Sequence, residues 1–173
     1  MAYITDSSDS GPNGIVVVDL ASGASWRRLH DHPSTKAEPL STYRPSVEGR
    51  PFLERPADGA PKPLSMGSDG IAISADGSRL HYCPLASRRW YSVATDALAD
   101  RDLTEDLVAA TVADEGDKGG GSDGLETDDS GRIRIRGRDR PARDGPAPAS
   151  TGLSRRPGRR PGPGRARAGS RRR

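Results

Sequence analysis

The sequence predicts an all-β fold, a partial β-propeller of about two to three blades, followed by a disordered basic tail. Three observations predict it. Short segments with β-strand character are bounded by tight-turn signals, one segment repeats at a spacing of 54 residues, and the composition changes abruptly near residue 132. The predicted organisation is therefore propeller blades over residues 1–132 and a tail over residues 133–173.

The first predicted strands come from β-branched and alternating runs. Residues 15–18 form a continuous β-branched run, which is typical of a strand buried on both faces. Ile71 and Ile73 alternate with smaller residues, as in a half-buried strand. Asn13-Gly14 and Asp76-Gly77 are strong signals for the tight turns between such strands.

The repeat groups these strands into units. Residues 68–77 and 122–131 both begin with Ser-Asp-Gly and an apolar residue, and both end at a glycine. A second echo pairs residues 2–20 with residues 80–94, each a strand, a turn and a strand. A unit of about 40–50 residues with four short strands is typical of a propeller blade. An open β-sandwich also fits short, evenly spaced strands, but the repeat favours the propeller.

Three segments between the strands are predicted to be irregular. Residues 31–67 contain seven prolines and little periodicity, which indicates a long loop. Residues 97–112 are compatible with one short helix or an irregular crossing. Residues 116–124 are glycine-rich without the spacing of a phosphate-binding loop, so we expect a flexible crossing into the next inner strand.

The tail differs sharply from the rest of the chain. Residues 132–173 contain 15 arginines and two acidic residues, and carry +13, whereas residues 1–131 carry −10 and all seven aromatic residues. A segment rich in Arg, Pro, Gly and Ala cannot bury enough apolar surface to fold, so we expect disorder. This mixture is typical of a GC-rich gene read out of frame, and we take the tail to be out of frame. An inert natural tail and a nucleic-acid-binding arm are the alternatives.

Composition excludes two classes of protein. No apolar run reaches the roughly 18–20 residues of a membrane-spanning helix. Cys83 is the only cysteine, which excludes a disulfide scaffold and favours a buried, inert thiol. The first residues contain no signal peptide, since they have neither a basic region nor an apolar core.

Three stretches of the chain resemble the Yellow / major royal jelly protein family in a bacterial-type form. They are residues 2–28, residues 69–93 with Asp69-Gly-Ile-Ala-Ile-Ser-Ala-Asp-Gly, and residues 116–128 with Ser122-Asp-Gly-Leu-Glu-Thr-Asp. The resemblance implies a six-bladed propeller of which this chain is a fragment. It also implies a secreted parent that binds small ligands, including amines in some members. From it we expect a binding protein rather than an enzyme, without robust activity by itself.

Asp69 and Asp123 are the candidate ligand-binding or metal-binding residues. In a propeller, the start of each innermost strand lies beside the central channel, so the two carboxylates would project toward one axial mouth. The pattern is similar to that of the gluconolactonase / senescence-marker family, where such a residue binds a divalent metal. That likeness implies an alternative function, a lactonase-like hydrolase using Ca²⁺ or another divalent cation. The structural alternative is that each aspartate caps its own glycine turn.

Other polar residues are expected to be structural or solvated. The run His30-Asp31-His32 precedes a proline in a loop and has no third ligand in view. The basic pairs Arg27-Arg28 and Arg88-Arg89 stand at turns and are expected to be solvated. Nucleic acid becomes a partner only if the basic tail is genuine.

Overall fold

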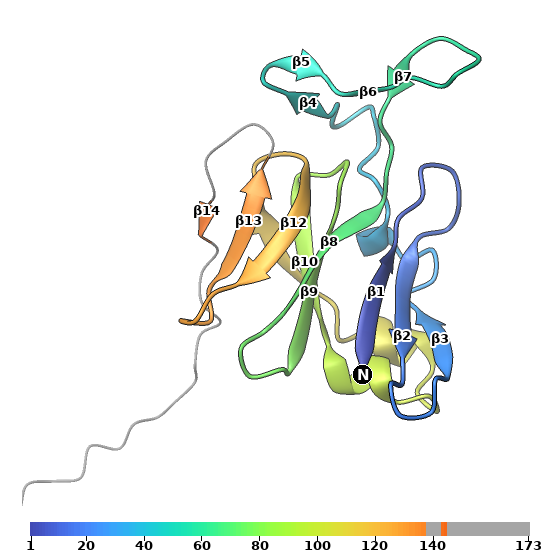
Figure 1. Cartoon of the computed structure of the whole chain (residues 1–173), viewed down its shortest axis with the longest axis vertical. Helices are drawn as coiled ribbons and strands as arrows, with labels where there is room; N and C mark the ends of the chain where they lie inside the picture. The colour runs from blue at the N-terminus through green and yellow to red at the C-terminus, as the bar shows by residue number, and fades with distance from the viewer. Residues whose placement is uncertain (138–142, 145–173) are drawn as a thin grey trace, which may run out of the picture.

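Three antiparallel sheets stand side by side in the computed structural model, which describes residues 1–137 and the backbone of 143–144 (Figure 1). The chain is all-β apart from a few short helices, as predicted. The first sheet has the order β1-β2-β3, the middle sheet β11-β10-β9-β8 and the third β12-β13-β14. Their bounds are β1 Ala2–Asp6, β2 Gly14–Val18, β3 Ser25–Arg28, β8 Ser68–Ile73, β9 Arg79–Pro84, β10 Arg89–Ala94, β11 Ala113–Asp117, β12 Ser122–Thr127, β13 Ile133–Gly137 and β14 Arg143–Asp144.

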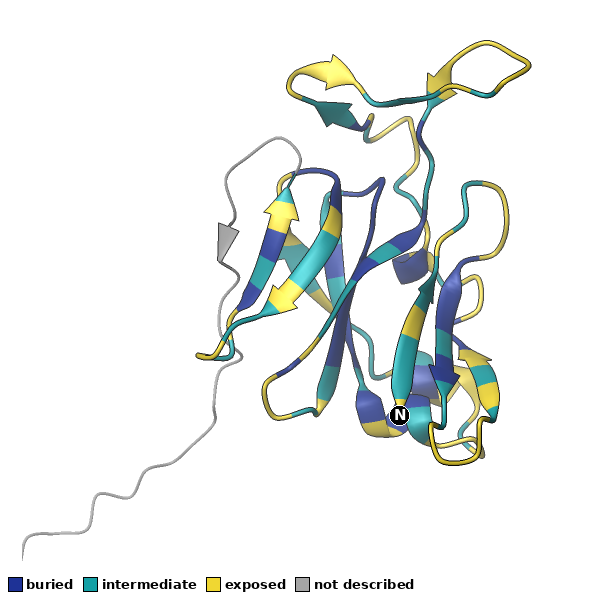
Figure 2. Cartoon of the chain, in the orientation of Figure 1, coloured by how far each residue is buried: buried dark blue, intermediate teal, exposed yellow. Residues whose placement is uncertain are grey.

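The middle sheet is covered on both faces, which accounts for its high burial (Figure 2). One face packs against the first sheet through a cluster that includes Ile15, Val17, Leu80 and Tyr82, all at most 2% exposed. The other face packs against the third sheet through a second cluster of Cys83, Trp90, Ile133 and Ile135, with Leu125 against it. Burial of these apolar side chains is the main force that joins the sheets.

The innermost strands of the middle and third sheets run parallel to each other. Thr127 Oγ1 of β12 donates to the carbonyl of Ile73 at the end of β8, and Gly70 near the start of β8 lies against Gly124. In contrast, β1 runs antiparallel to β8, because Thr5 contacts the carbonyl of Asp69 and the later Ser7 contacts that of the earlier Ser68. The strand direction therefore alternates between β1 and β8 but not between β8 and β12.

The turns that follow β8 and β12 are stabilised by matching hydrogen bonds. Asp76 accepts from the backbone and side chain of Ser78, and Asp128 accepts in the same way from Ser130. Hydrogen bonds from the Ser74 hydroxyl, which is the largest cause, and from Ser78 lower the pKa of Asp76 to about 2. The glycines that close the turns, Gly77 and Gly131, have φ of 72° and 78°, a region that favours glycine. The sequence repeat thus gives the two turns the same hydrogen bonds and the same glycine conformation.

The proline-rich segment is more ordered than predicted. A 3-10 helix, η1 (Pro33–Thr35), is followed by two small hairpins, β4 (Ser46–Val47) with β5 (Arg50–Pro51) and β6 (Leu53–Glu54) with β7 (Lys62–Pro63). Strands of two residues are too short to show periodicity, so the sequence pattern could not reveal them. They project beyond the three sheets (Figure 1).

Two short helices, rather than one, connect β10 to β11. They are α1 (Thr95–Ala99) and α2 (Glu105–Ala109). Their apolar residues Leu98 and Val108 are fully buried in the cluster between the first and middle sheets. Arg28, which we expected to be solvated, is 7% exposed because Glu105 and the carbonyl of Leu103 bind its guanidinium.

The boundary expected at residue 132 falls inside the third sheet. Strand β13 begins at Ile133, and its Ile133 and Ile135 are 1% and 4% exposed. Alternating isoleucines give this strand one buried face even though arginines lie between them. The disorder predicted from residue 133 on is therefore wrong for β13 and for β14, which pairs with it. For the rest of the tail the prediction lies outside the described residues, and the out-of-frame origin stays a prediction.

No helix in the described residues is long and apolar enough to cross a membrane.

Candidate functional site

Asp69 and Asp123 occupy equivalent places on the two parallel inner strands. The register of β8 with β9 shifts between Ser68 and Gly70, and that of β12 with β13 shifts between Ser122 and Gly124. Each aspartate is therefore the extra residue of a β-bulge. Bulges re-aim a side chain relative to its strand and are frequent beside functional sites. Neither aspartate lies in a tight turn, in contrast to Asp76 and Asp128.

The two bulges lie close together because the inner strands approach tightly at their starts. A methyl group placed on Gly70 would come within 2.5 Å of Leu125 Cδ1 and 3.3 Å of the backbone nitrogen of Gly124. The Ser68 and Ser122 side chains point inward and are fully buried. Asp123 is exposed and Asp69 is partly exposed.

Cys83 lies beneath this pair. Its Sγ is 3.5 Å from the carbonyl oxygen of Ser122. Burial raises the pKa of the Cys83 thiol to about 12, and the charges of Asp69 and Asp123 add to that rise. The thiol is therefore neutral and inert at physiological pH, as expected from the sequence.

Lys118 holds the loop that leads into β12. It is 6% exposed, and its Nζ donates to the carbonyls of Ser87 and Gly120, the second at 2.6 Å. The backbone nitrogen of Lys118 donates to the carbonyl of Arg88 at 2.7 Å, so both the main chain and the side chain of Lys118 hold the loop. Burial lowers the pKa of Lys118. The glycine-rich crossing, which we expected to be flexible, is thus fastened to the middle sheet just before Asp123.

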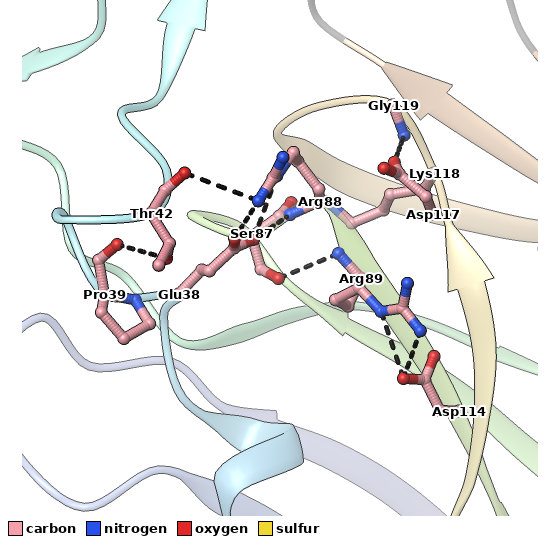
Figure 3. Close-up of polar contacts among 10 residues, drawn as sticks. All are labelled: Glu38, Pro39, Thr42, Ser87, Arg88, Arg89, Asp114, Asp117, Lys118 and Gly119. Carbon is pink, nitrogen blue, oxygen red and sulfur yellow. Dashed lines mark hydrogen bonds and ion pairs between the residues drawn. The ribbon is translucent and has the colours of Figure 1, made fainter.

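Ion pairs lie around the contacts of Lys118 with the carbonyls of Ser87, Arg88 and Gly120, which we call the Lys118 clamp (Figure 3). Glu38 accepts from the Arg88 backbone nitrogen at 3.1 Å and pairs with its guanidinium, and Arg89 Nε donates to Asp114 at 3.1 Å. The arginine pair expected to be solvated is therefore engaged with carboxylates. The hydrogen bond from Arg88 is the largest cause that lowers the pKa of Glu38. These contacts tie the segment after η1 to the turn between β9 and β10.

A groove of about 680 Å³ lies beside the turn between β1 and β2. Its lining includes Asp9, His30, Asp31 and Lys36, and Asp31 pairs with Lys36 at 2.8 Å. The groove adjoins the beginning of β8, since its lining residue Asn13 lies against Gly67. It offers a polar space that the sequence pattern did not indicate.

The second histidine of the run His30-Asp31-His32 is engaged within the protein. His32 caps η1 by accepting from the backbone nitrogen of Ser34, and its Nδ1 lies 2.7 Å from the Ser34 hydroxyl. That hydroxyl also contacts the Tyr82 hydroxyl at 2.5 Å and is buried. This His–Ser contact is therefore a structural cap within the protein.

The residues present do not by themselves fit a calcium site. Ca²⁺ takes six to eight oxygen ligands. Among the described residues, no group of three or more His, Cys, Asp or Glu side chains could hold a metal ion. Asp69 and Asp123 supply two carboxylates, which offer fewer oxygens than the six to eight that Ca²⁺ takes.

Sequence reasoning found the two aspartates but missed the clamp. The Ser-Asp-Gly repeat marked Asp69 and Asp123 because it recurs with regular spacing. Lys118 is a lone lysine among glycines, and nothing in that pattern distinguishes a buried ammonium from a solvated one.

Comparison with known proteins agrees with this architecture. A search of curated proteins finds no match to the chain. The model of the major royal jelly protein family matches residues 1–139, which includes all three sheets up to the end of β13. The chain therefore belongs to the major royal jelly protein family.

Proposed function

We propose that this chain is part of a secreted β-propeller that binds a small ligand through Asp69 and Asp123, without catalysing a reaction. One observation carries the proposal: the two aspartates lie at equivalent bulges of adjacent parallel strands, where Asp123 is exposed and Asp69 is partly exposed. Two carboxylates on neighbouring strands attract a cation, and the family resemblance suggests a small amine. A primary ammonium donates three hydrogen bonds, which two carboxylates can share.

The neighbouring groove supports a ligand of modest size. Its volume of about 680 Å³ is within the range of roughly 300–1,000 Å³ usual for small-molecule sites. Because it adjoins the beginning of β8, the body of an amine bound at Asp69 could extend toward it. Because we propose just two carboxylates of the described residues as ligands, we expect weak binding and no robust activity of the chain by itself.

The test uses tyramine as the probe and 4-ethylphenol, which lacks the ammonium, as its matched control. We expect NMR titration to show tyramine binding that Asp69→Asn and Asp123→Asn each weaken roughly tenfold or more. The control variant Asp58→Asn, in an exposed loop, should bind normally. Equal binding of 4-ethylphenol, or loss of binding in Asp31→Asn alone, would contradict the assignment.

The hydrolase alternative is tested on the same variants. Thermal stabilisation by CaCl₂ that disappears in both Asp69→Asn and Asp123→Asn would favour a metal site, and lactone turnover would then favour the hydrolase. We expect neither. A nucleic-acid function would depend on the basic tail, which lies outside the described residues, and is tested by salt-sensitive DNA binding of the full chain.

A further inference from the structure

The turn between β9 and β10, residues 85–88, is hydrogen-bonded to the segment that leads into β8. The backbone nitrogen of Leu85 donates to the carbonyl of Gly67 at 2.9 Å. That of Ala86 donates to the carbonyl of Met66 at 3.0 Å. Leu85 and Ala86 are 5% and 1% exposed, so these hydrogen bonds are shielded from water. The entrance to β8 is therefore fixed to this turn.

The same turn is hydrogen-bonded to the loop that leads into β12. The carbonyl of Arg88 accepts from the backbone nitrogen of Lys118 at 2.7 Å, and that of Ser87 accepts from the Lys118 Nζ. At the end of this loop, a methyl group placed on Gly121 would come within 3.1 Å of the carbonyl oxygen of Leu85. One turn therefore holds the entrances to both inner strands, and with them the spacing of the two bulges.

Glu38 fastens this turn to the segment after η1 (Figure 3). Its backbone nitrogen donates to the carbonyl of Ala86 at 2.9 Å, and its carboxylate binds both the backbone nitrogen and the guanidinium of Arg88. The same guanidinium lies 3.5 Å from the carbonyl of Thr42 and over the ring of Tyr43. The Glu38 side chain is 14% exposed. Because hydrogen bonds to an ionised and largely buried carboxylate are strong, Glu38 restrains the turn effectively.

We propose that Glu38 is a positioning residue of the ligand site, which sets the distance between Asp69 and Asp123 by holding the turn at residues 85–88. This inference rests on the proposed function, in which the two aspartates bind one ammonium. Two carboxylates share an ammonium only over a narrow range of separations, so a loosened turn weakens binding although both ligands are present. By linkage, a ligand held by both aspartates stabilises the contact between Glu38 and Arg88.

Hydrogen exchange of the full chain without ligand tests the restraint itself. Glu38→Gln keeps the size of the side chain and removes its charge. In this variant we expect the amides of Leu85 and Lys118 to exchange roughly fivefold faster or more, while the amides of β2 keep their rates. The matched control is Glu105→Gln, whose carboxylate also binds one arginine and one backbone nitrogen. It should leave the exchange of Leu85 and Lys118 unchanged.

Titration with tyramine tests the effect of the restraint on the site. We expect Glu38→Gln alone to weaken tyramine binding roughly threefold or more. The same substitution should have little further effect once Asp69→Asn or Asp123→Asn has removed one carboxylate, because the distance between the two then no longer matters. A merely structural role of Glu38 would instead weaken binding by the same factor in all three backgrounds, and that result would overturn the proposal.

The remaining outcomes separate this proposal from the proposed function. If tyramine does not bind the unmodified chain, the proposed function fails, and faster exchange in Glu38→Gln still supports control of both strand entrances by the turn. If tyramine binds but Glu38→Gln changes neither exchange nor affinity, the positioning role is overturned and the proposed function stands. Exchange of the β2 amides that rises as much as that of Leu85 also overturns it. If Glu38→Gln does not fold, Arg88→Gln removes the same ion pair and is judged by the same outcomes.

Discussion

At the scale of single residues, two buried polar side chains of the described part of the chain contrast, Lys118 and His81. Lys118 is buried, but its ammonium is bound by two carbonyls. His81 is 4% exposed, it stacks on Trp90 at 5.3 Å, and neither ring nitrogen has a hydrogen-bond partner. Burial lowers the pKa of His81, against the smaller opposite effect of Glu115, while Arg79 adds to the lowering and Asp76 opposes it.

This environment predicts a loss of stability in mild acid. The folded chain keeps His81 neutral, whereas the unfolded chain binds a proton below about pH 6.5, so stability is complete above that pH and falls below it. We expect His81→Phe, which keeps the stacking, to reduce the loss between pH 7 and pH 5. It should also raise stability at pH 7 by about 1 kcal/mol, because no buried polar atom remains unpaired.

Urea unfolding of both chains at pH 7, 6 and 5 measures the effect. His30→Asn, at an exposed ring, is the control and should leave the pH profile unchanged. Parallel profiles for the original chain and His81→Phe would show that His81 does not carry this dependence.

At the scale of elements, the Ser-Asp-Gly motifs of β8 and β12 are packed differently. Gly70 and Gly124 both follow a Ser-Asp pair and both lie at a bulge. Gly70 has side chains and backbone of the middle and third sheets directly over it, whereas the nearest atoms to a methyl on Gly124 are those of Arg136 at 3.9 Å. The close approach of the inner strands therefore depends on Gly70.

Gly70→Ala should destabilise the chain by about 1–3 kcal/mol, because the new methyl would press against Cys83 Sγ at 3.0 Å and against Leu125. Gly124→Ala should change stability by less than about 0.5 kcal/mol, since the methyl enters ordinary contact distance. Chemical denaturation of the two variants side by side provides the comparison. Equal losses would mean that the inner strands are not packed as closely as described.

The elements that the sequence predicted are those governed by local chemistry. The β-branched run forms β2 and the Asp76-Gly77 turn is found as predicted, because both depend on neighbouring residues. The burial of β2 on both faces was wrong, since Ile15 and Val17 are buried but Val16 and Val18 are only partly so. The two-residue hairpins, the clamp at Lys118 and the start of β13 depend on partners distant in the chain. Their signals are therefore weak in a single sequence. The candidate site is intermediate, because the repeat marked its two residues, but the bulges that place them required the structure.

At the scale of the whole molecule, the three sheets form a sequence of layers, each packed on the next. The middle sheet has a packed neighbour on both faces (Figure 2). The third sheet contributes Ile133 and Ile135 to the layer around Trp90 and Cys83. The folded region therefore extends past residue 132, in agreement with the family match to residue 139.

Ile135→Ala tests whether this third layer is part of the cooperative unit. Ile135 is 4% exposed, so removing its side-chain carbons should cost about 2–5 kcal/mol. Ile4→Ala removes the same atoms from a residue that is 53% exposed and should cost less than about 0.5 kcal/mol. Both are measured by thermal and urea unfolding with Trp fluorescence, which reports on the layer through Trp90. If Ile135→Ala behaved like Ile4→Ala, β13 would not belong to the fold, and the boundary would return to residue 132. A large loss of unfolding free energy would instead show that β13, with its arginines, is part of the packed layers. A cavity lowers the stability of the whole chain only if the sheet around it is formed in the folded state.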